Sequence, residues 1–240
     1  MKSKLEFLDL GCLDYSEVEE RQRYFAKQFE LSDNSRDILL VADHPPTLTI
    51  GKNKRWNVVH KKLEDFNALG IQVYEAHRGG GAAILGPGQI AFYPILNLRK
   101  LGINQFEFFR RVNEAILGLS NRLGVNEGET FLGNEFNPAT KRNYHCVWHQ
   151  NGKGKKKFSA QGYKIKLSGL VCLGGWTVYF GQEATKGFDL IDHCGFNISK
   201  VGATSLEEII GINFGRQKVR DLMVDEFSKI MGYRSYEESS

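Results

Sequence analysis

The sequence predicts an α+β fold, a mixed and largely antiparallel sheet packed with helices. Three segments carry apolar residues at helical spacing, near the start, the middle and the end of the chain. Short apolar or alternating segments, typical of strands, dominate the stretches between them. Strands and helices do not alternate regularly, as they would in a doubly wound parallel sheet, so helices packed on a mixed sheet are favoured.

The three predicted helices cover residues 15–31, 105–123 and about 217–231. Asp14 precedes the first of them and is a suitable N-cap residue. The middle helix has the clearest pattern, because apolar residues every three or four positions form one stripe: Phe106, Phe109, Val112, Ile116, Leu119 and Leu123. We expect each helix to bury its apolar stripe against the sheet.

The predicted strands are short and are separated by turn-forming residues. They cover residues 5–10, 37–42, 47–50, 72–76, 90–97, 158–165, 170–173 and 176–180. The segment His44-Pro45-Pro46 breaks the backbone between two of them. Residues 146–165 are predicted to form a hairpin whose overlong basic tip is residues 153–157, and the polar tail, residues 233–240, is expected to be loose.

Length and composition favour a single domain over residues 1–240, of the ordinary globular class. Hydrophobic residues make up 41% of the chain and charged residues 25%, which is sufficient for a buried core. The net charge of +4 is too small to indicate nucleic-acid binding, but it is compatible with acidic protein partners. Since neither a signal peptide nor an 18-residue apolar span is apparent, we expect a cytoplasmic protein.

Four cysteines are widely spaced, at positions 12, 146, 172 and 194. No CxxC pair or Cys/His cluster at zinc-ligand spacing occurs, so no metal site is predicted. Disulfides are not expected in a cytoplasmic chain of this size. Each cysteine is therefore either a small buried hydrophobic residue or a reactive thiol.

The most unusual segment is the glycine-rich stretch at residues 78–89, which contains five glycines in twelve residues. Missing side chains allow another group to approach the backbone closely, and Arg78 adds a charge. The pattern matches neither GxxxxGK[ST] nor a GxGxxG turn. Two interpretations remain open: a tight strand connection that needs positive φ, or a binding loop whose apolar residues 82–85 suit a ligand with a polar head and an alkyl tail.

Cys194 is the strongest candidate nucleophile, because polar neighbours and Gly195 place it at a loop or strand end. Only a few per cent of an ordinary thiol is thiolate at pH 7, and a nearby ammonium group raises that fraction. Lys157, at the end of the basic run, is one candidate for this group. His193 is a competing candidate, although adjacent strand residues point to opposite faces.

In their order and spacing these motifs resemble those of the lipoyl-pathway octanoyltransferases, which share a fold with biotin and lipoate protein ligases. Residues 78–89 and the apolar strand after them are similar to the family's RGGQxTxHGPGQ. Residues 43–51 are similar to EHPPxxTxG, and residues 147–162 to GVWV…KIAAxG. Cys194-Gly195 with residues 201–206 is similar to PCG…VTSL. The resemblance spans residues 11–206 and implies a catalytic domain like that of the biotin and lipoate protein ligases.

The resemblance also implies roles for particular residues. Cys194 is expected to carry the acyl group as a thioester, and Lys157 to lower the pKa of its thiol. Fourteen residues are expected to line the acyl site: Arg78, Gly79, Gly80, Gly81, Ala82, Ala83, Ile84, Leu85, Ala160, Gln161, Gly162, Gly175, Trp176 and Thr177.

The implied substrates are two proteins. Octanoyl-acyl carrier protein is the expected donor, and a lysine on a lipoyl domain, of a 2-oxoacid dehydrogenase or the glycine cleavage H protein, is the expected acceptor. No cofactor, no membrane and no nucleic acid are expected, and the chain is expected to be a monomer.

Several positions depart from the family pattern. Leu85 and Gly174 stand where the family has histidines, Ala83 replaces a threonine, and His193 replaces a proline. Two alternatives therefore stay open beside octanoyl transfer. One is an ATP-dependent lipoate or biotin ligase, although the GRGRxGR loop of biotin ligases is absent. The other is a non-catalytic acyl-binding relative.

Overall fold

The computed structural model describes residues 4–32, 36–126, 129–137, 142–151, 154–193, 196–197 and 202–239. Its helices are α1 (Tyr15–Leu31), α2 (Leu63–Ala68), α3 (Gln105–Arg122), α5 (Leu206–Ile210) and α6 (Arg216–Met231), with short 3-10 turns η1 (Lys54–Trp56), η2 (Gln182–Thr185) and η3 (Phe188–Leu190). Within these ranges no helix is long and apolar enough to cross a membrane.

The central element is a mixed six-stranded sheet in the order β10-β11-β6-β2-β1-β14. Its first three pairings, from β10 to β2, are antiparallel, and the pairings β2–β1 and β1–β14 are parallel. The strands are β1 (Leu5–Cys12), β2 (Asp37–Asp43), β6 (Gln89–Asn97), β10 (Ser159–Ile165), β11 (Leu170–Tyr179) and β14 (Tyr236–Glu238). The predicted α+β class with a mixed sheet is confirmed.

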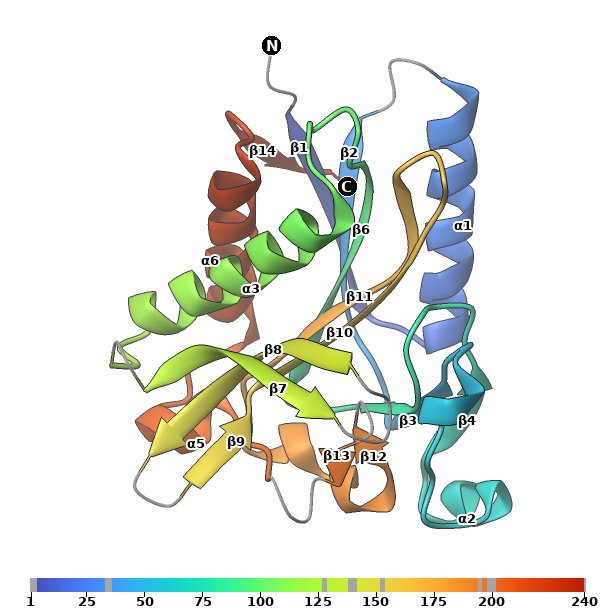
Figure 1. Ribbon diagram of the computed structural model, residues 1–240, viewed down its shortest axis with the longest axis vertical. Helices are drawn as coiled ribbons and strands as arrows, with labels where there is room; N and C mark the ends of the chain where they lie inside the picture. The colour runs from blue at the N-terminus through green and yellow to red at the C-terminus, as the bar shows by residue number, and fades with distance from the viewer. Residues whose placement is uncertain are drawn as a thin grey trace.

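Helices cover both faces of this sheet (Figure 1). α1 packs on one face, where Val18 and Phe29 join a buried cluster with residues of β2, β6 and β11. α3 and α6 cover the other face, in a larger cluster that includes Phe108, Val112 and Phe227. The apolar spacing of α3 is realised with one exception, because Phe106 is 68% exposed while Phe108 is buried. The predicted stripe was wrong at Phe106, which lies in the first turn of α3 and lines a cavity.

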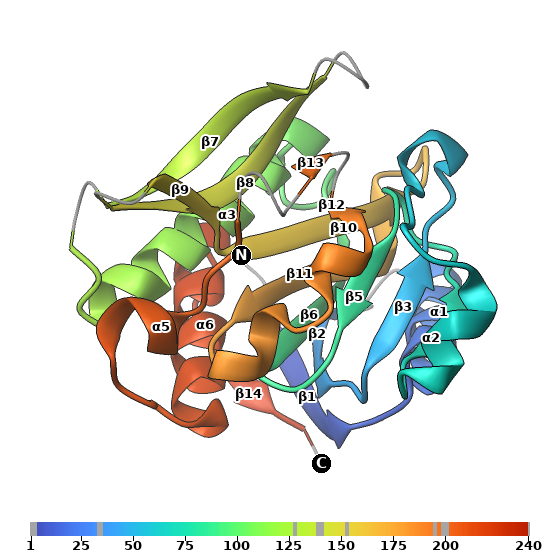
Figure 2. The ribbon, with the colours of Figure 1, turned by 90° about the horizontal axis from the view of Figure 1, so that it is seen from below.

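Two smaller three-stranded sheets flank the end of the main sheet (Figure 2). One consists of β3 (Thr47–Ile50), β4 (Gln72–Glu75) and β5 (Ala83–Leu85), in the order β4-β3-β5. The other consists of β7 (Thr130–Asn137), β8 (Arg142–Asn151) and β9 (Gly154–Lys157). A two-stranded pair, β12 (Asp192–His193) and β13 (Phe196–Asn197), completes the strands.

Three further expectations need correction. The basic run is the strand β9 and pairs with β8, so residues 155–157 are no hairpin tip, and β10 pairs with β11 instead. The two strands predicted within residues 170–180 are one strand, β11, whose register with β6 shifts between Val171 and Trp176; Gly174, with a φ of +82°, lies in this interval. The tail is ordered where β14 pairs with β1, since Phe7 packs on Tyr236 at 5.9 Å between ring centroids.

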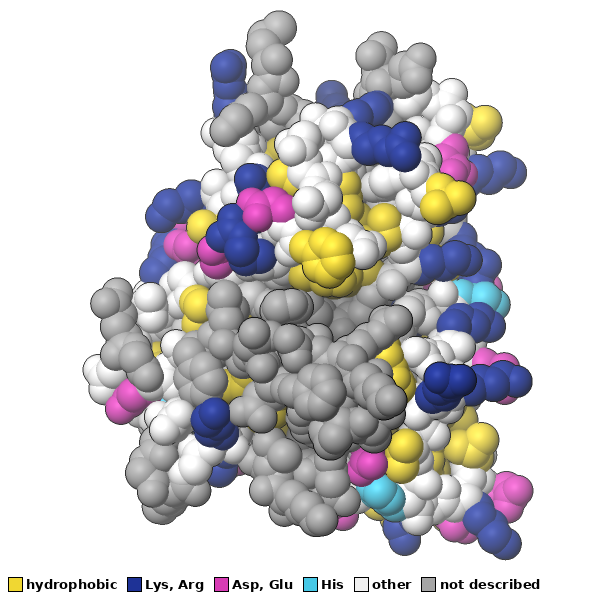
Figure 3. Space-filling model, in the orientation of Figure 1, with side chains coloured by type: hydrophobic (Ala, Val, Ile, Leu, Met, Phe, Trp, Pro, Cys, Tyr) yellow, Lys and Arg dark blue, Asp and Glu magenta, His cyan; other side chains and the backbone are white. Residues whose placement is uncertain are grey.

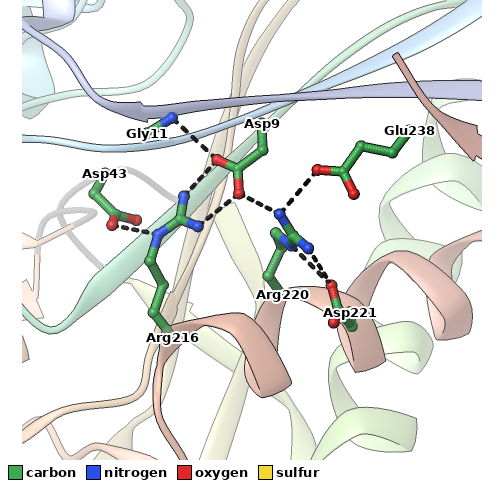
Figure 4. Close-up of polar contacts among 7 residues, drawn as sticks. All are labelled: Asp9, Gly11, Asp43, Arg216, Arg220, Asp221 and Glu238. Carbon is green, nitrogen blue, oxygen red and sulfur yellow. Dashed lines mark hydrogen bonds and ion pairs between the residues drawn. The ribbon is translucent and has the colours of Figure 1, made fainter. Parts of the chain in front are cut away.

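A cluster of ion pairs, which we call the clamp, fastens α6 to the sheet (Figure 4). Arg216 binds both carboxylate oxygens of Asp9 at 2.6 Å and one of Asp43 at 2.5 Å. Arg220 binds Asp9 at 2.5 Å and Glu238 at 3.0 Å. Burial alone would raise the pKa of Asp9, but the bonds from Arg216 and Arg220 outweigh it and lower that pKa to about 2.

Candidate active site

A cavity of about 1220 Å³ is lined by residues of the main sheet and of both smaller sheets. Its wall combines residues 52–56, the glycine-rich loop, and parts of β5, β6, β10, β11 and α3. Small residues form much of this wall, including Ala82, Ala91, Ala160 and Gly162. An apolar cavity with a few polar groups is the usual form of a small-molecule site.

The glycine-rich loop owes its composition to two close backbone contacts. A Cβ atom on Gly81 would lie 2.1 Å from the carbonyl oxygen of Trp56, and one on Gly79 would lie 2.4 Å from that of Tyr163. Both distances are too short for any side chain, so these positions need glycine. The loop is thus wedged between residues 51–56 and the edge strand β10.

Arg78 is buried at the start of this loop and fixes it to β3. Its guanidinium donates hydrogen bonds to the carbonyl of Gly79 at 2.9 Å and to Thr49, at 3.1 Å to the carbonyl and 2.6 Å to the hydroxyl. The residue is only 8% exposed, yet it lines the cavity. Its charge was expected to serve ligand binding; the geometry gives it at least a structural role in shaping the wall.

A neutral histidine supports another part of the wall. His44 contacts the carbonyl oxygen of Leu13 through Nδ1 at 2.8 Å and the hydroxyl of Tyr93 through Nε2 at 2.6 Å. A carbonyl oxygen can only accept, so Nδ1 carries the proton and Tyr93 donates to Nε2. Burial lowers the pKa of His44 to about 4, which keeps this ring neutral at pH 7. Tyr93, held in this way, lines the cavity.

All fourteen residues predicted to form the acyl site line this one cavity, from Arg78 to Leu85, from Ala160 to Gly162 and from Gly175 to Thr177. Their role in binding an acyl group stays a prediction. The ring of Trp176 also belongs to the core, because it stacks on Phe92 at 5.2 Å and packs on Phe227 at 4.9 Å between centroids.

Gly174 and Leu85, the two departures from the family histidines, have different structural reasons. A Cβ atom on Gly174 would lie 2.1 Å from the carbonyl oxygen of Gly162, so no histidine fits in this conformation. The backbone N–H of Gly174 is instead bound by the side chain of Gln22 at 2.8 Å. Leu85 is buried in the cluster beside α1. Both positions are thus integrated into the packing.

Lys157 is completely buried at the end of β9, opposite Trp148 of β8. Its backbone N–H donates to the carbonyl of Gly202 at 3.0 Å, and its carbonyl accepts from Thr204 at 2.9 Å. The chain that follows Cys194 therefore returns to run beside Lys157. Lys157 is not among the described residues that line the cavity.

Cys194 lies outside the described residues, so its predicted pairing with Lys157 stays a prediction. The chain before it is anchored near the cavity: the N–H of Asp192 donates to the carbonyl of Val58 at 3.0 Å, and Ile191 forms an isolated bridge with Val59. His193, the competing activator, is described only as part of the β12–β13 pair.

Sequence reasoning missed several cavity residues. Cations line the wall just before Trp56, and aromatic residues reach it from α1, β6 and α3: Lys52, Lys54, Arg55, Tyr15, Tyr93, Phe106 and Phe109. Residues 52–55 directly follow Thr49-Ile50-Gly51, the end of the motif at residues 43–51. This position next to a motif could have indicated that the cations belong to the site. Cys146 also lines the cavity. In the described part of the chain, no group of His, Cys, Asp or Glu side chains could hold a metal ion.

Comparisons with known proteins agree with this architecture. A family model described as "Lipoyl protein ligase A/B catalytic domain" matches residues 14–228. A protein named octanoyltransferase from Desulforamulus reducens is 29% identical, over 96% of this chain and 92% of its own length. One of the same name from Chloroflexus aggregans is 30% identical, over 94% of each chain.

Structural similarity points to the same fold. A putative lipoate protein ligase from T. acidophilum, solved with bound lipoic acid, superposes with a TM-score of 0.67 at 16% identity. The match covers 100% of this chain and 90% of that one. The matched length, the octanoyltransferase relatives and the shared fold lead to one conclusion: the chain belongs to the lipoyl protein ligase A/B catalytic domain family.

Proposed function

We propose that this protein is an acyltransferase that moves an octanoyl group from acyl carrier protein to a lysine of a lipoyl domain. The observation that carries the proposal is its similarity, over almost the whole chain, to proteins named octanoyltransferase. The cavity supports it, because a wall rich in small and apolar residues suits an alkyl chain.

Cys194 is the proposed carrier of the acyl group between the two proteins. In the first half-reaction its thiolate attacks the carbonyl carbon of the donor thioester, forming a new C–S bond. The bond to the donor sulfur then breaks, and the departing thiolate takes a proton from the Lys157 ammonium group. One thioester replaces another, so this step needs no ATP.

The second half-reaction releases the acyl group to the acceptor. The neutral amine of the acceptor lysine attacks the Cys194 thioester, an amide bond forms, and the Cys194 thiolate leaves. The proton lost by the amine returns to Lys157, which restores the starting state. The burial of Lys157 favours these roles, because an ammonium group acts more strongly on a nearby thiolate inside a protein than in water.

Intact-mass measurement tests the proposal directly. Incubation with octanoyl-acyl carrier protein should add one octanoyl group to the wild type and none to Cys194→Ala, whereas Cys172→Ala, which alters a buried cysteine outside the cavity wall, should still be acylated. Transfer to a lipoyl domain by Cys194→Ala would refute the thioester route.

The role of Lys157 needs a separate measurement. The rate at which iodoacetamide alkylates Cys194, followed by peptide mass mapping as a function of pH, reports the pKa of its thiol. In Lys157→Met the midpoint should move up by at least about one pH unit, towards the ordinary cysteine value near 8.5. An unchanged midpoint would assign the activation to another group, such as His193.

An ATP-dependent ligase is the second candidate, favoured by the fold shared with a putative lipoate protein ligase. It predicts that free octanoate and ATP together modify the lipoyl domain. Octanoyl transfer from acyl carrier protein without ATP, and none from octanoate with ATP, would decide against it. Tight octanoyl binding with no turnover from either source would point instead to a non-catalytic relative.

A further inference from the structure

Three cations stand at the mouth of the cavity, and we call them the basic rim: Lys52, Lys54 and Arg55. All three side chains are exposed as well as lining the cavity. Among the described residues no carboxylate lies within ion-pair distance of any of them. Figure 3 shows Lys and Arg side chains on both sides of this face of the molecule, with Asp and Glu side chains among them.

The backbone beneath the basic rim is held in a defined position. Lys52 donates its N–H to the carbonyl of Arg78, and Asn53 to that of Gly80, both at 3.2 Å. Trp56 accepts from the N–H of Ala82 at 3.3 Å. We call these contacts, together with the close approach at Gly81, the loop junction. It fixes the rim against the glycine-rich loop, so these charges keep their place relative to the cavity.

An exposed aromatic residue from a different element joins the same mouth. Phe106, in the first turn of α3, is 68% exposed and lines the cavity. Exposed aromatic side chains are a common feature of protein-docking surfaces, where aromatic residues are enriched. The mouth therefore offers both charge and apolar contact to an incoming protein.

We propose that the basic rim, together with Phe106 on the lining of the same cavity, docks the acidic face of the carrier protein that delivers the acyl group. Charge complementarity selects this partner, because three exposed cations that form no ion pair with another described residue favour carboxylates on the approaching surface. The donor is favoured over the acceptor because its acyl group is borne on a long prosthetic arm, which can reach the reacting thiol while the carrier remains at the rim. The inference rests on the proposed function and adds the surface that selects the donor.

The double variant Lys54→Glu/Arg55→Glu tests the docking surface. At low ionic strength it should raise the KM for octanoyl-carrier protein about tenfold, and added salt should shrink this difference, since exposed charges are screened. The KM for octanoyl-pantetheine, which has no protein and no phosphate, should rise much less than the KM for the carrier protein.

The matched control, Arg21→Glu/Lys27→Glu, changes the net charge equally at exposed positions of α1 that do not line the cavity, and it should behave as wild type. Phe106→Ser should raise the same KM with little salt dependence.

Three outcomes would overturn the inference. An equal KM increase with octanoyl-coenzyme A would show that the rim binds the phosphates of the arm, not the carrier's surface. A KM increase for the lipoyl domain, and none for the carrier, would assign the rim to the acceptor. An unchanged KM for every donor would leave the rim without a docking role. A binding measurement complements these kinetic outcomes. Binding of the unacylated carrier protein to Cys194→Ala, with and without the rim substitutions, reports docking even where no transfer occurs.

Discussion

The clamp and the cavity wall are stabilised by different kinds of interaction, charged in the clamp and uncharged at the wall. In the clamp, Arg216 and Arg220 face carboxylates from three strands, and the contacts need charge on both sides. At the cavity wall, backbone contacts with glycines form the loop junction, and Tyr93 is held by a His44 ring that must stay neutral. The clamp should therefore be destabilised when its carboxylates lose their charge. The cavity wall should be destabilised when His44 becomes protonated or when a glycine of the loop junction is replaced by a larger residue.

The largest effect should come from breaking the loop junction. In Gly81→Ala the new Cβ would lie 2.1 Å from the carbonyl oxygen of Trp56, a clash with backbone that cannot be relieved by a side-chain rotation. We expect a loss of at least about 3 kcal/mol in the free energy of unfolding, measured by urea denaturation. Gly86→Ala is the matched control, because its Cβ would meet nothing closer than 3.6 Å. Equal stability of the two variants would contradict the assigned role of Gly81.

A smaller effect should follow from charging His44. Its pKa is lowered from 6.5 to about 4 by burial, so the unfolded chain takes up a proton between these values and the folded chain does not. Stability contributed by this group is complete above pH 6.5 and falls by about 3 kcal/mol as the pH drops to 4. His44→Gln should be less stable than wild type at pH 7 but should lose less on acidification. Parallel pH profiles of the two proteins would contradict this account.

The clamp should respond only in stronger acid. Because the pKa of Asp9 is lowered to about 2, its contribution is present above about pH 4 and is lost as the pH falls towards 2. Asp9→Asn should be about 2 kcal/mol less stable than wild type at pH 5, and this gap should narrow below pH 4. Asp221→Asn, which alters a half-exposed partner of Arg220 alone, should change stability much less. A stability difference between wild type and Asp9→Asn that stays constant down to pH 3 would show that the charge of the Asp9 carboxylate does not cause it.

Local patterns in the sequence predicted the parts of the fold that depend on local spacing. The strand at Thr47–Ile50 and the helices α1 and α3 follow directly from apolar periodicity and turn residues. The glycine-rich loop was predicted as a candidate binding segment because its composition departs from that of an ordinary connection, and the cavity lies against it. Family resemblance supplied the expected roles of Cys194 and Lys157, which periodicity alone does not give.

What could not be predicted depends on contacts between distant segments. Asp9 and Arg216 stand far apart in the chain, and nothing in either neighbourhood indicates their pairing. Glu19 and Gln22 interrupt the apolar face of α1 because they bind the backbone N–H groups of His77 and Gly174, which a helical pattern cannot foresee. Phe106 matches the apolar spacing of α3 and is nevertheless exposed, because that spacing does not tell which positions of the helix line a cavity.

The parallel pairing of β14 with β1 bears on how the chain tolerates shortening. β14 is only three residues long and forms one margin of the main sheet, so it shields the unpaired amide and carbonyl groups of the longer strand behind it. A chain cut before Tyr233 would expose the edge of that longer strand, which could then pair with a strand of another copy. We therefore expect β14 to reduce aggregation by covering the edge of β1.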